Sequence, residues 1–109
     1  MRECFRVLKP GGVLRVGVPN AGRLLLSYAG DRCYLEEIHP GRPTAMLALQ
    51  ELFYWHRHRT MFDTQTLALA FTSAGLKEPV ECIFGGTKLP LVPDTERRRA
   101  ETLYMEAVR

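Results

Sequence analysis

The sequence predicts an α/β fold in which a small sheet of three strands is flanked by helices. A helical pattern over residues 1–9 stops at Pro10-Gly11-Gly12, and an apolar run over residues 13–19 follows at once. Later, a helical pattern over residues 64–74 passes into an alternating strand pattern over residues 80–84. Helices and strands that follow one another along the chain are typical of α/β domains.

The first expected element is the end of a helix. Phe5 and Leu8 lie three residues apart and form an apolar face. Lys9 places a positive charge where the helix dipole is negative. The pattern begins at Met1 without a capping residue, so we expect the chain to start inside a helix of a longer domain.

Residues 13–19 form the first expected strand. Val13, Leu14, Val16 and Val18 make this run almost continuously apolar. Such runs are typical of strands that are covered on both faces, as in mostly parallel sheets. We therefore expect this strand to be buried.

Short helices and loops fill the middle of the chain. Leucines and tyrosines over residues 23–38 indicate one or two short helices, interrupted at Gly30-Asp31. A loop over residues 40–43 precedes a helix that runs from Ala45 to about Trp55. Thr44 has the side chain to cap the first turn of that helix.

The last third of the chain holds one helix and two strands. Gly75 follows the helix of residues 64–74, at the position where glycine adopts the left-handed conformation that ends a helix. A strand over residues 80–84 leads into a proline-rich loop over residues 85–95. Residues 103–108 alternate between two faces with period two and form the last expected strand.

Composition narrows the class of protein. The chain has 109 residues, 46% of them hydrophobic and 25% charged, as in a small globular domain. Its net charge of +3 is too small to favour a nucleic-acid partner. The three cysteines form neither an even framework nor a metal-binding spacing, and no segment reads as a membrane span or a secretion signal. We expect a cytoplasmic protein with no membrane partner.

Three segments, taken in order, are similar to the type 11 methyltransferase domain, which is a class I S-adenosylmethionine-dependent methyltransferase family. Residues 3–20 resemble its fifth-strand segment, E-x-x-R-V-L-K-P-G-G-x-L-R-V-x-V-P-N. Residues 56–76 resemble the next segment, with Phe62-Asp63 before a helix that ends at Ala74-Gly75-Leu76. Residues 96–107 resemble the closing segment, R-x-x-E/S-S/T-L-Y-x-E-A. The resemblance covers nearly the whole chain.

The resemblance implies a partial Rossmann-like methyltransferase fold, with residues 1–109 as the C-terminal half of the domain. Its three-stranded sheet would be mixed, with the last strand antiparallel and central, between the strands of residues 13–19 and 80–84. Residues 21–60 would be a helical insertion on the substrate side.

The family's cofactor is S-adenosylmethionine, held by a Gly-rich turn after the first strand and an acidic residue after the second. Neither feature is present in this chain. Gly85-Gly86 follow a strand, but no amphipathic helix pattern follows them. We therefore expect no cofactor-binding residues here and no cofactor bound by this chain alone.

Three functions remain open on this resemblance. In the first, the chain is a methyltransferase fragment, as from a truncated gene, and is inactive alone. In the second, it is half of a split enzyme that assembles with a separate N-terminal chain. In the third, it is a non-catalytic binding or interaction module with the same fold. The edge of strand 13–19 would pair with a fourth strand that this chain lacks, and unpaired strand edges recruit other chains. We expect that edge to bind an N-terminal methyltransferase half or a second copy, unless residues 21–38 cover it.

The candidate pocket residues follow from position and side-chain chemistry, and no catalytic residue is assigned. Pro19 and Asn20 lie just past the carboxyl end of a strand, where ligands bind in open α/β sheets; Asn20 equally suits a plain turn. Tyr54, His56 and His58 combine an aromatic side chain with imidazoles that titrate near neutrality. The alternative interpretation is that these histidines lie at the surface and have no role in a site.

A metal site is the other interpretation of the histidines. It would combine His39, His56 and His58, with or without Cys33. No cluster of cysteines or carboxylates completes such a site in the sequence, so we expect no metal.

Overall fold

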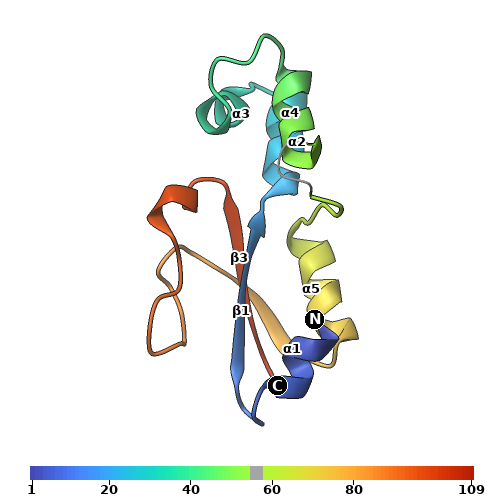
Figure 1. The fold of residues 1–109 in the computed structure, drawn as a ribbon, viewed down its shortest axis with the longest axis vertical. Helices are drawn as coiled ribbons and strands as arrows, with labels where there is room; N and C mark the ends of the chain where they lie inside the picture. The colour runs from blue at the N-terminus through green and yellow to red at the C-terminus, as the bar shows by residue number, and fades with distance from the viewer. Residues whose placement is uncertain (55–57) are drawn as a thin grey trace. The chain divides into compact units, whose positions relative to one another are not determined.

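The computed structural model describes residues 1–54 and 58–109, and the chain forms two compact units. One unit comprises Met1–Val18 with Thr64–Arg109, and the other comprises Pro19–Asp63. The elements are α1 (Arg2–Val7), β1 (Val13–Pro19), α2 (Ala21–Ala29), α3 (Cys33–Ile38), α4 (Ala45–Tyr54), α5 (Thr64–Ser73), β2 (Lys77–Cys82), the short 3-10 helix η1 (Glu96–Arg98) and β3 (Thr102–Val108) (Figure 1).

The first unit is built on a three-stranded sheet in the order β1-β3-β2. The last strand is therefore central, as predicted. β3 runs antiparallel to β2, with Val80 opposite Glu106. It also runs antiparallel to β1, because Gly12 bonds to Arg109 at one end of the pair and Gly17 lies beside Thr102 at the other. Since the central strand opposes both neighbours, the sheet is antiparallel throughout, and the prediction of a mixed sheet is wrong.

The first strand is less buried than the sequence predicted. Every residue of β1 is half-buried except Gly17, which is exposed. The reason is its place in the sheet: β1 is an edge strand, whereas β3 takes the central position and contains most of the buried residues of the sheet. The continuous apolar run predicted the strand correctly, but the expectation that this strand is buried is wrong.

Helix α5 packs against β2 and β3 and completes the core of this unit. Leu67 and Phe71 are fully buried on α5, and Leu103 and Met105 are buried on one face of β3. The helix ends where the sequence predicted. Gly75 has φ +94°, and the N–H of Leu76 donates to the carbonyl of Phe71 at 3.1 Å, which is the hydrogen-bond pattern of a Schellman motif.

The opposite face of β3 is closed by the loop that follows β2. Glu106, only 2% exposed, accepts hydrogen bonds from the Thr87 hydroxyl and the Lys88 N–H of that loop. Because side chains alternate along a strand, Tyr104 shares this face with Glu106. The Phe84 ring meets the Tyr104 ring edge-on, with centroids 6.1 Å apart.

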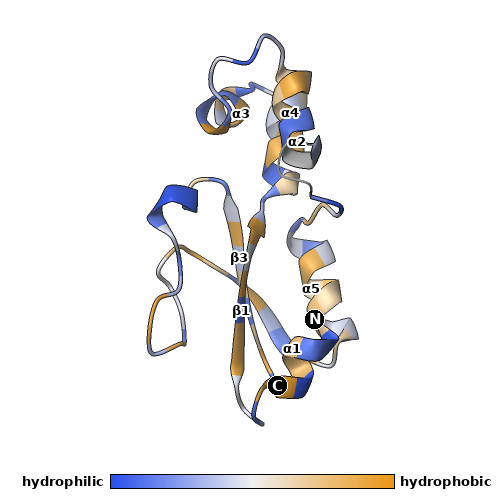
Figure 2. Ribbon diagram, viewed as in Figure 1, coloured by the Kyte–Doolittle hydropathy of each residue, from blue (hydrophilic) through white to orange (hydrophobic). Residues whose placement is uncertain are grey.

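The second unit consists of helices α2, α3 and α4 around a core of its own. The core residues are Leu24, Tyr34, Leu35, Ala48 and Leu49. In the sequence, Gln50 and Glu51 interrupt the apolar residues of α4, and Figure 2 shows the resulting change of hydropathy along that helix. The buried Ser27 hydroxyl accepts from the Leu35 N–H at 3.1 Å and joins α2 to α3. Thr44 caps α4 as predicted, accepting from the Leu47 N–H at 3.2 Å.

Candidate functional site

Pro19 and Asn20 lie where β1 passes into α2. Pro19 is the last residue of the strand, and Asn20 is the N-cap of the helix. The Asn20 amide oxygen accepts from the Arg23 N–H at 3.0 Å, and its backbone forms a parallel bridge with Phe62. The Asn20 side chain thus caps a helix, which agrees with the turn interpretation.

The aromatic and histidine candidates lie at the end of α4 and beyond it. Tyr54 is 82% exposed and lines a depression of about 450 Å³ together with Pro43 and Leu47. His58 is half-buried and engaged by a neighbouring group. His56 lies outside the described residues. Pro19, Asn20 and His58 line neither this depression nor the pocket at α3 described next.

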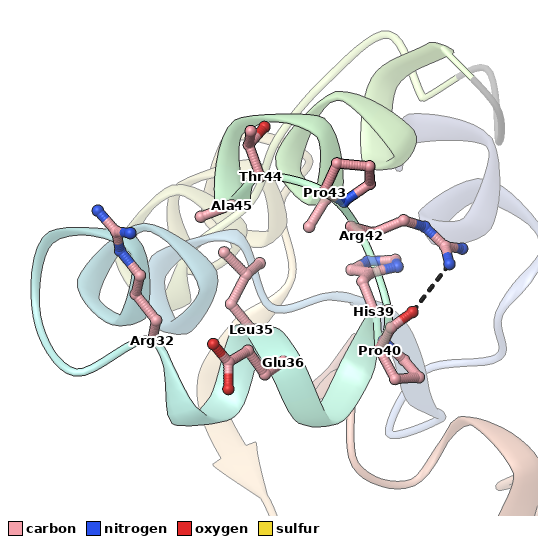
Figure 3. A pocket seen from close by; sticks show the side chains of 11 residues that line it. Arg32, Leu35, Glu36, His39, Pro40, Arg42, Pro43, Thr44 and Ala45 are labelled. Atoms are coloured by element: carbon pink, nitrogen blue, oxygen red, sulfur yellow. Dashed lines mark hydrogen bonds between the residues drawn. The ribbon is translucent and has the colours of Figure 1, made fainter.

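A pocket of about 470 Å³ lies wholly within the second unit, between α3, the loop of residues 40–43 and the start of α4. Positions 32, 35, 36 and 39 are spaced three and four apart, so one face of α3 and its caps lines the pocket. Figure 3 shows Arg32 and His39 at opposite ends of α3, with Leu35 between them.

His39 is buried at the C-cap of α3 and is held by a carboxylate. Its Nδ1 lies 3.1 Å from Oε2 of Glu51 in α4. Arg42 holds the same carboxylate from the loop: its Nε lies 2.6 Å from Oε1 of Glu51, and its Nη1 donates to the Pro40 carbonyl at 2.9 Å (Figure 3). The Arg42 hydrogen bond is the main reason that the pKa of Glu51 is lowered, so Glu51 stays ionised beside the imidazole.

This arrangement fixes which nitrogen of His39 is available. With Nδ1–H donating to Glu51, the lone pair of the neutral imidazole is on Nε2. Among residues 1–54 and 58–109, the polar contact of the His39 side chain is the one at Nδ1, and His39 lines the pocket. A histidine oriented by a carboxylate can accept a proton or a hydrogen bond from a ligand.

The sequence alone indicates only part of this arrangement of His39, Glu51 and Arg42. The sequence indicates His39 as a metal candidate, but Glu51 lies on the next helix, and no helical or strand period relates the two positions. Arg42 and Glu51 are nine residues apart across a proline-containing loop, whose path the sequence does not define. In the described part of the chain, no group of three or more histidines, cysteines and carboxylates is placed to hold a metal ion.

A second charged cluster, centred on Arg15, is paired internally. Arg15 of β1 and Asp94 of the loop after β2 have side chains only 2% exposed, and their closest N–O distance is 2.7 Å. All five guanidinium N–H groups of Arg15 have acceptors: both oxygens of Asp94, one of Glu106, and the carbonyls of Ile83 and Gly86. This cluster fastens the loop to the sheet.

The glycines of the chain do not form a cofactor cradle. Gly11-Gly12 precede β1, and a loop rather than a helix follows Gly85-Gly86. A Cβ at Gly86 would lie 2.8 Å from the Ile83 side chain, so this glycine accommodates Ile83. The residues present therefore do not fit the Gly-rich turn that the methyltransferase resemblance would require.

Comparison with known proteins leaves the family open. No family model, curated protein or solved structure matches this chain. Within the described residues, no helix has both the length and the apolar composition to cross a bilayer.

Proposed function

We propose that this chain is the C-terminal half of an S-adenosylmethionine-dependent methyltransferase domain and is inactive without a cofactor-binding half. The observation that carries the proposal is the strand order β1-β3-β2, with the last strand antiparallel in the centre. The sequence resemblance implies this order, whereas a chain of consecutive hairpins would place β2 in the centre. Helix α5 leads into β2, as the resemblance also implies.

The second unit has the position that the resemblance gives to the substrate-side insertion. It spans Pro19–Asp63, close to the insertion of residues 21–60, and it contains the pocket at His39. We assign substrate contact to this unit and cofactor contact to a half that this chain does not supply. The reaction of such a domain depends mainly on the alignment of two bound partners.

A non-catalytic binding module is the second candidate function. One observation favours it: the pocket of the second unit is lined entirely by residues 32–48 and needs no other chain to form. A cytoplasmic location suits both candidates, because Cys4, Cys33 and Cys82 are all free thiols.

Assembly with a separate N-terminal half tests the proposal. The chain is co-expressed with a polypeptide that covers the first four strands of a type 11 methyltransferase domain, and the mixture is analysed by size-exclusion chromatography with light scattering. A one-to-one complex is expected, formed along the free edge of β1. Separate elution of the two chains at all concentrations would contradict a split-domain role and leave the binding module as the better account.

A further inference from the structure

We infer that the pocket at His39 binds a small organic acid that also carries a hydroxyl or amino group. The pocket volume of about 470 Å³ lies within the range of small-molecule sites. His39 would accept a hydrogen bond from the hydroxyl or amino group, and Arg32 would pair with the acidic group. Identifying this ligand as the methyl acceptor rests on the proposed function; the binding itself does not.

His39 supplies the contact to the hydroxyl or amino group. It is only 9% exposed, and its Nδ1 is engaged by Glu51. His39 lines the pocket, and in the neutral imidazole the remaining nitrogen, Nε2, carries a lone pair that can accept a hydrogen bond. Glu51 is itself fixed by Arg42 through both carboxylate oxygens, so the imidazole is oriented before any ligand arrives.

Arg32 supplies the charge. Its guanidinium lies over the Tyr28 ring at 5.7 Å and has no carboxylate partner among the described residues. Its backbone has φ +65°, a left-handed conformation that non-glycine residues rarely adopt. This strained residue lies at the rim of the pocket, where it leaves a cation available for an anionic ligand.

The spacing of these two groups sets the size of the ligand. Arg32 and His39 are seven residues apart at the two ends of α3, which is about 10 Å along a helix axis and returns to the same face. Leu35 and Ala48 are among the apolar residues that line the pocket. A ligand with an acid at one end, an apolar middle and a hydroxyl at the other end fits this pattern.

Titration calorimetry with 4-hydroxyphenylacetate tests the inference on the full chain. Phenylacetate lacks the hydroxyl and p-cresol lacks the acid, and each is expected to bind about tenfold more weakly, the effect of one hydrogen bond or ion pair. In His39→Asn, which keeps an amide N–H for Glu51 but loses Nε2, the preference for the hydroxyl should disappear. In Arg32→Gln, the preference for the acid should disappear.

Controls separate local contacts from general effects. Arg97→Gln removes the same charge from the exposed 3-10 helix and should leave all three affinities unchanged. Circular dichroism verifies that each variant is folded. Absence of saturable binding of 4-hydroxyphenylacetate to the wild type, or ligand preferences that persist in both variants, would overturn the inference. Because no cofactor or second chain is present, that result would leave the assembly test of the proposed function untouched.

Discussion

Arg15 connects three parts of the first unit through one guanidinium group. It extends from β1 to Glu106 on β3 and to Asp94 in the loop after β2. It also lies over the Tyr104 ring, 4.9 Å from the centroid. Because every donor of the group is used, removing the side chain leaves two buried carboxylates without their cation.

Arg15→Met should therefore destabilise the protein severely. Removal of one partner from a buried ion pair costs about 3–5 kcal/mol. Arg98→Gln is the matched control, because the Arg98–Glu101 pair is half-exposed and worth at most about 1 kcal/mol. Urea denaturation followed by circular dichroism gives both values. Equal losses in the two variants would show that the Arg15 cluster does not hold the loop.

The same cluster predicts loss of stability in acid. The Arg15 hydrogen bond lowers the pKa of Asp94 below its ordinary 3.8. Burial raises the pKa of Glu106, but hydrogen bonds from Thr87, Lys88 and Arg15 outweigh that effect and leave it lowered. Groups with lowered folded-state pKa stabilise the fold above their unfolded pKa, and this contribution is lost as the pH falls through the folded pKa.

The free energy of unfolding should accordingly fall below about pH 4. Asp94→Asn should flatten that decline, as measured by urea denaturation at a series of pH values. Glu3→Gln is the control: the pKa of Glu3 is also lowered by Arg6, but that pair is exposed to solvent and screened. A wild-type protein whose stability does not change in acid would contradict the ion-pair account.

Gly75 has both a positive φ and a close neighbour where a Cβ would lie, whereas the other glycines have at most one of these two constraints. Its φ is +94°, and a Cβ would lie 3.2 Å from the Phe5 ring. Gly11 has φ +76° with open space around it. Gly75→Ala should cost about 1 kcal/mol and more than Gly11→Ala. Thermal denaturation of the two variants compares them, and the reverse order would show that the helix end tolerates a side chain.

At the scale of the elements, local signals in the sequence predicted most positions. Gly75 and Thr44 are end signals that act over one helical turn, so the ends of α5 and α4 follow from a few neighbouring residues. Non-local contacts carry no such signal. Arg15 and Asp94 are 79 residues apart, and nothing in the loop predicts that its one aspartate turns inward to the sheet.

The observed bounds of β2 differ from the predicted bounds because of its pairing with β3. Alternation predicted a strand over residues 80–84, whereas β2 spans Lys77–Cys82 and leaves Ile83 79% exposed. The register explains the shift: β2 pairs with β3 from Lys77 opposite Val108, with an irregularity before Val80. The candidate site was predicted less well than the elements, because the contact between His39 and Glu51 depends on how α3 and α4 pack.

The free edge of β1 is expected to bind a second copy or an N-terminal half. Two proline variants can separate this role of the edge from the stability of the sheet. Gly12 directs its carbonyl to Arg109, so the alternate residues Val13 and Arg15 direct their backbone groups away from β3. Arg15→Pro is unsuitable, because it also removes the buried guanidinium. Val13→Pro changes only the free edge at the start of the strand, where proline is tolerated.

Leu14→Pro is the matched variant on the paired side of β1. Val13→Pro should remain folded and weaken self-association or binding of an N-terminal half, whereas Leu14→Pro should unfold the sheet. Sedimentation velocity and circular dichroism give the two measurements. A wild-type protein that stays monomeric at high concentration, with no response of assembly to Val13→Pro, would contradict a role for this edge.

At the scale of the whole molecule, the two units carry different parts of the proposed function. The unit of Met1–Val18 and Thr64–Arg109 contains the sheet and its free edge, and the unit of Pro19–Asp63 contains the pocket at His39. Neither contains a glycine turn that fits a cofactor. The central claim of the proposal is that these residues supply the substrate side of the domain and that the cofactor site lies outside them.

Calorimetric titration with S-adenosylmethionine tests this claim most directly. The chain is titrated alone and again in the presence of an N-terminal methyltransferase half whose own cofactor affinity has been measured. We expect no measurable heat from the chain alone, and tighter one-to-one binding by the two chains together than by the N-terminal half. Micromolar binding by this chain alone, with a stoichiometry near one, would contradict the account.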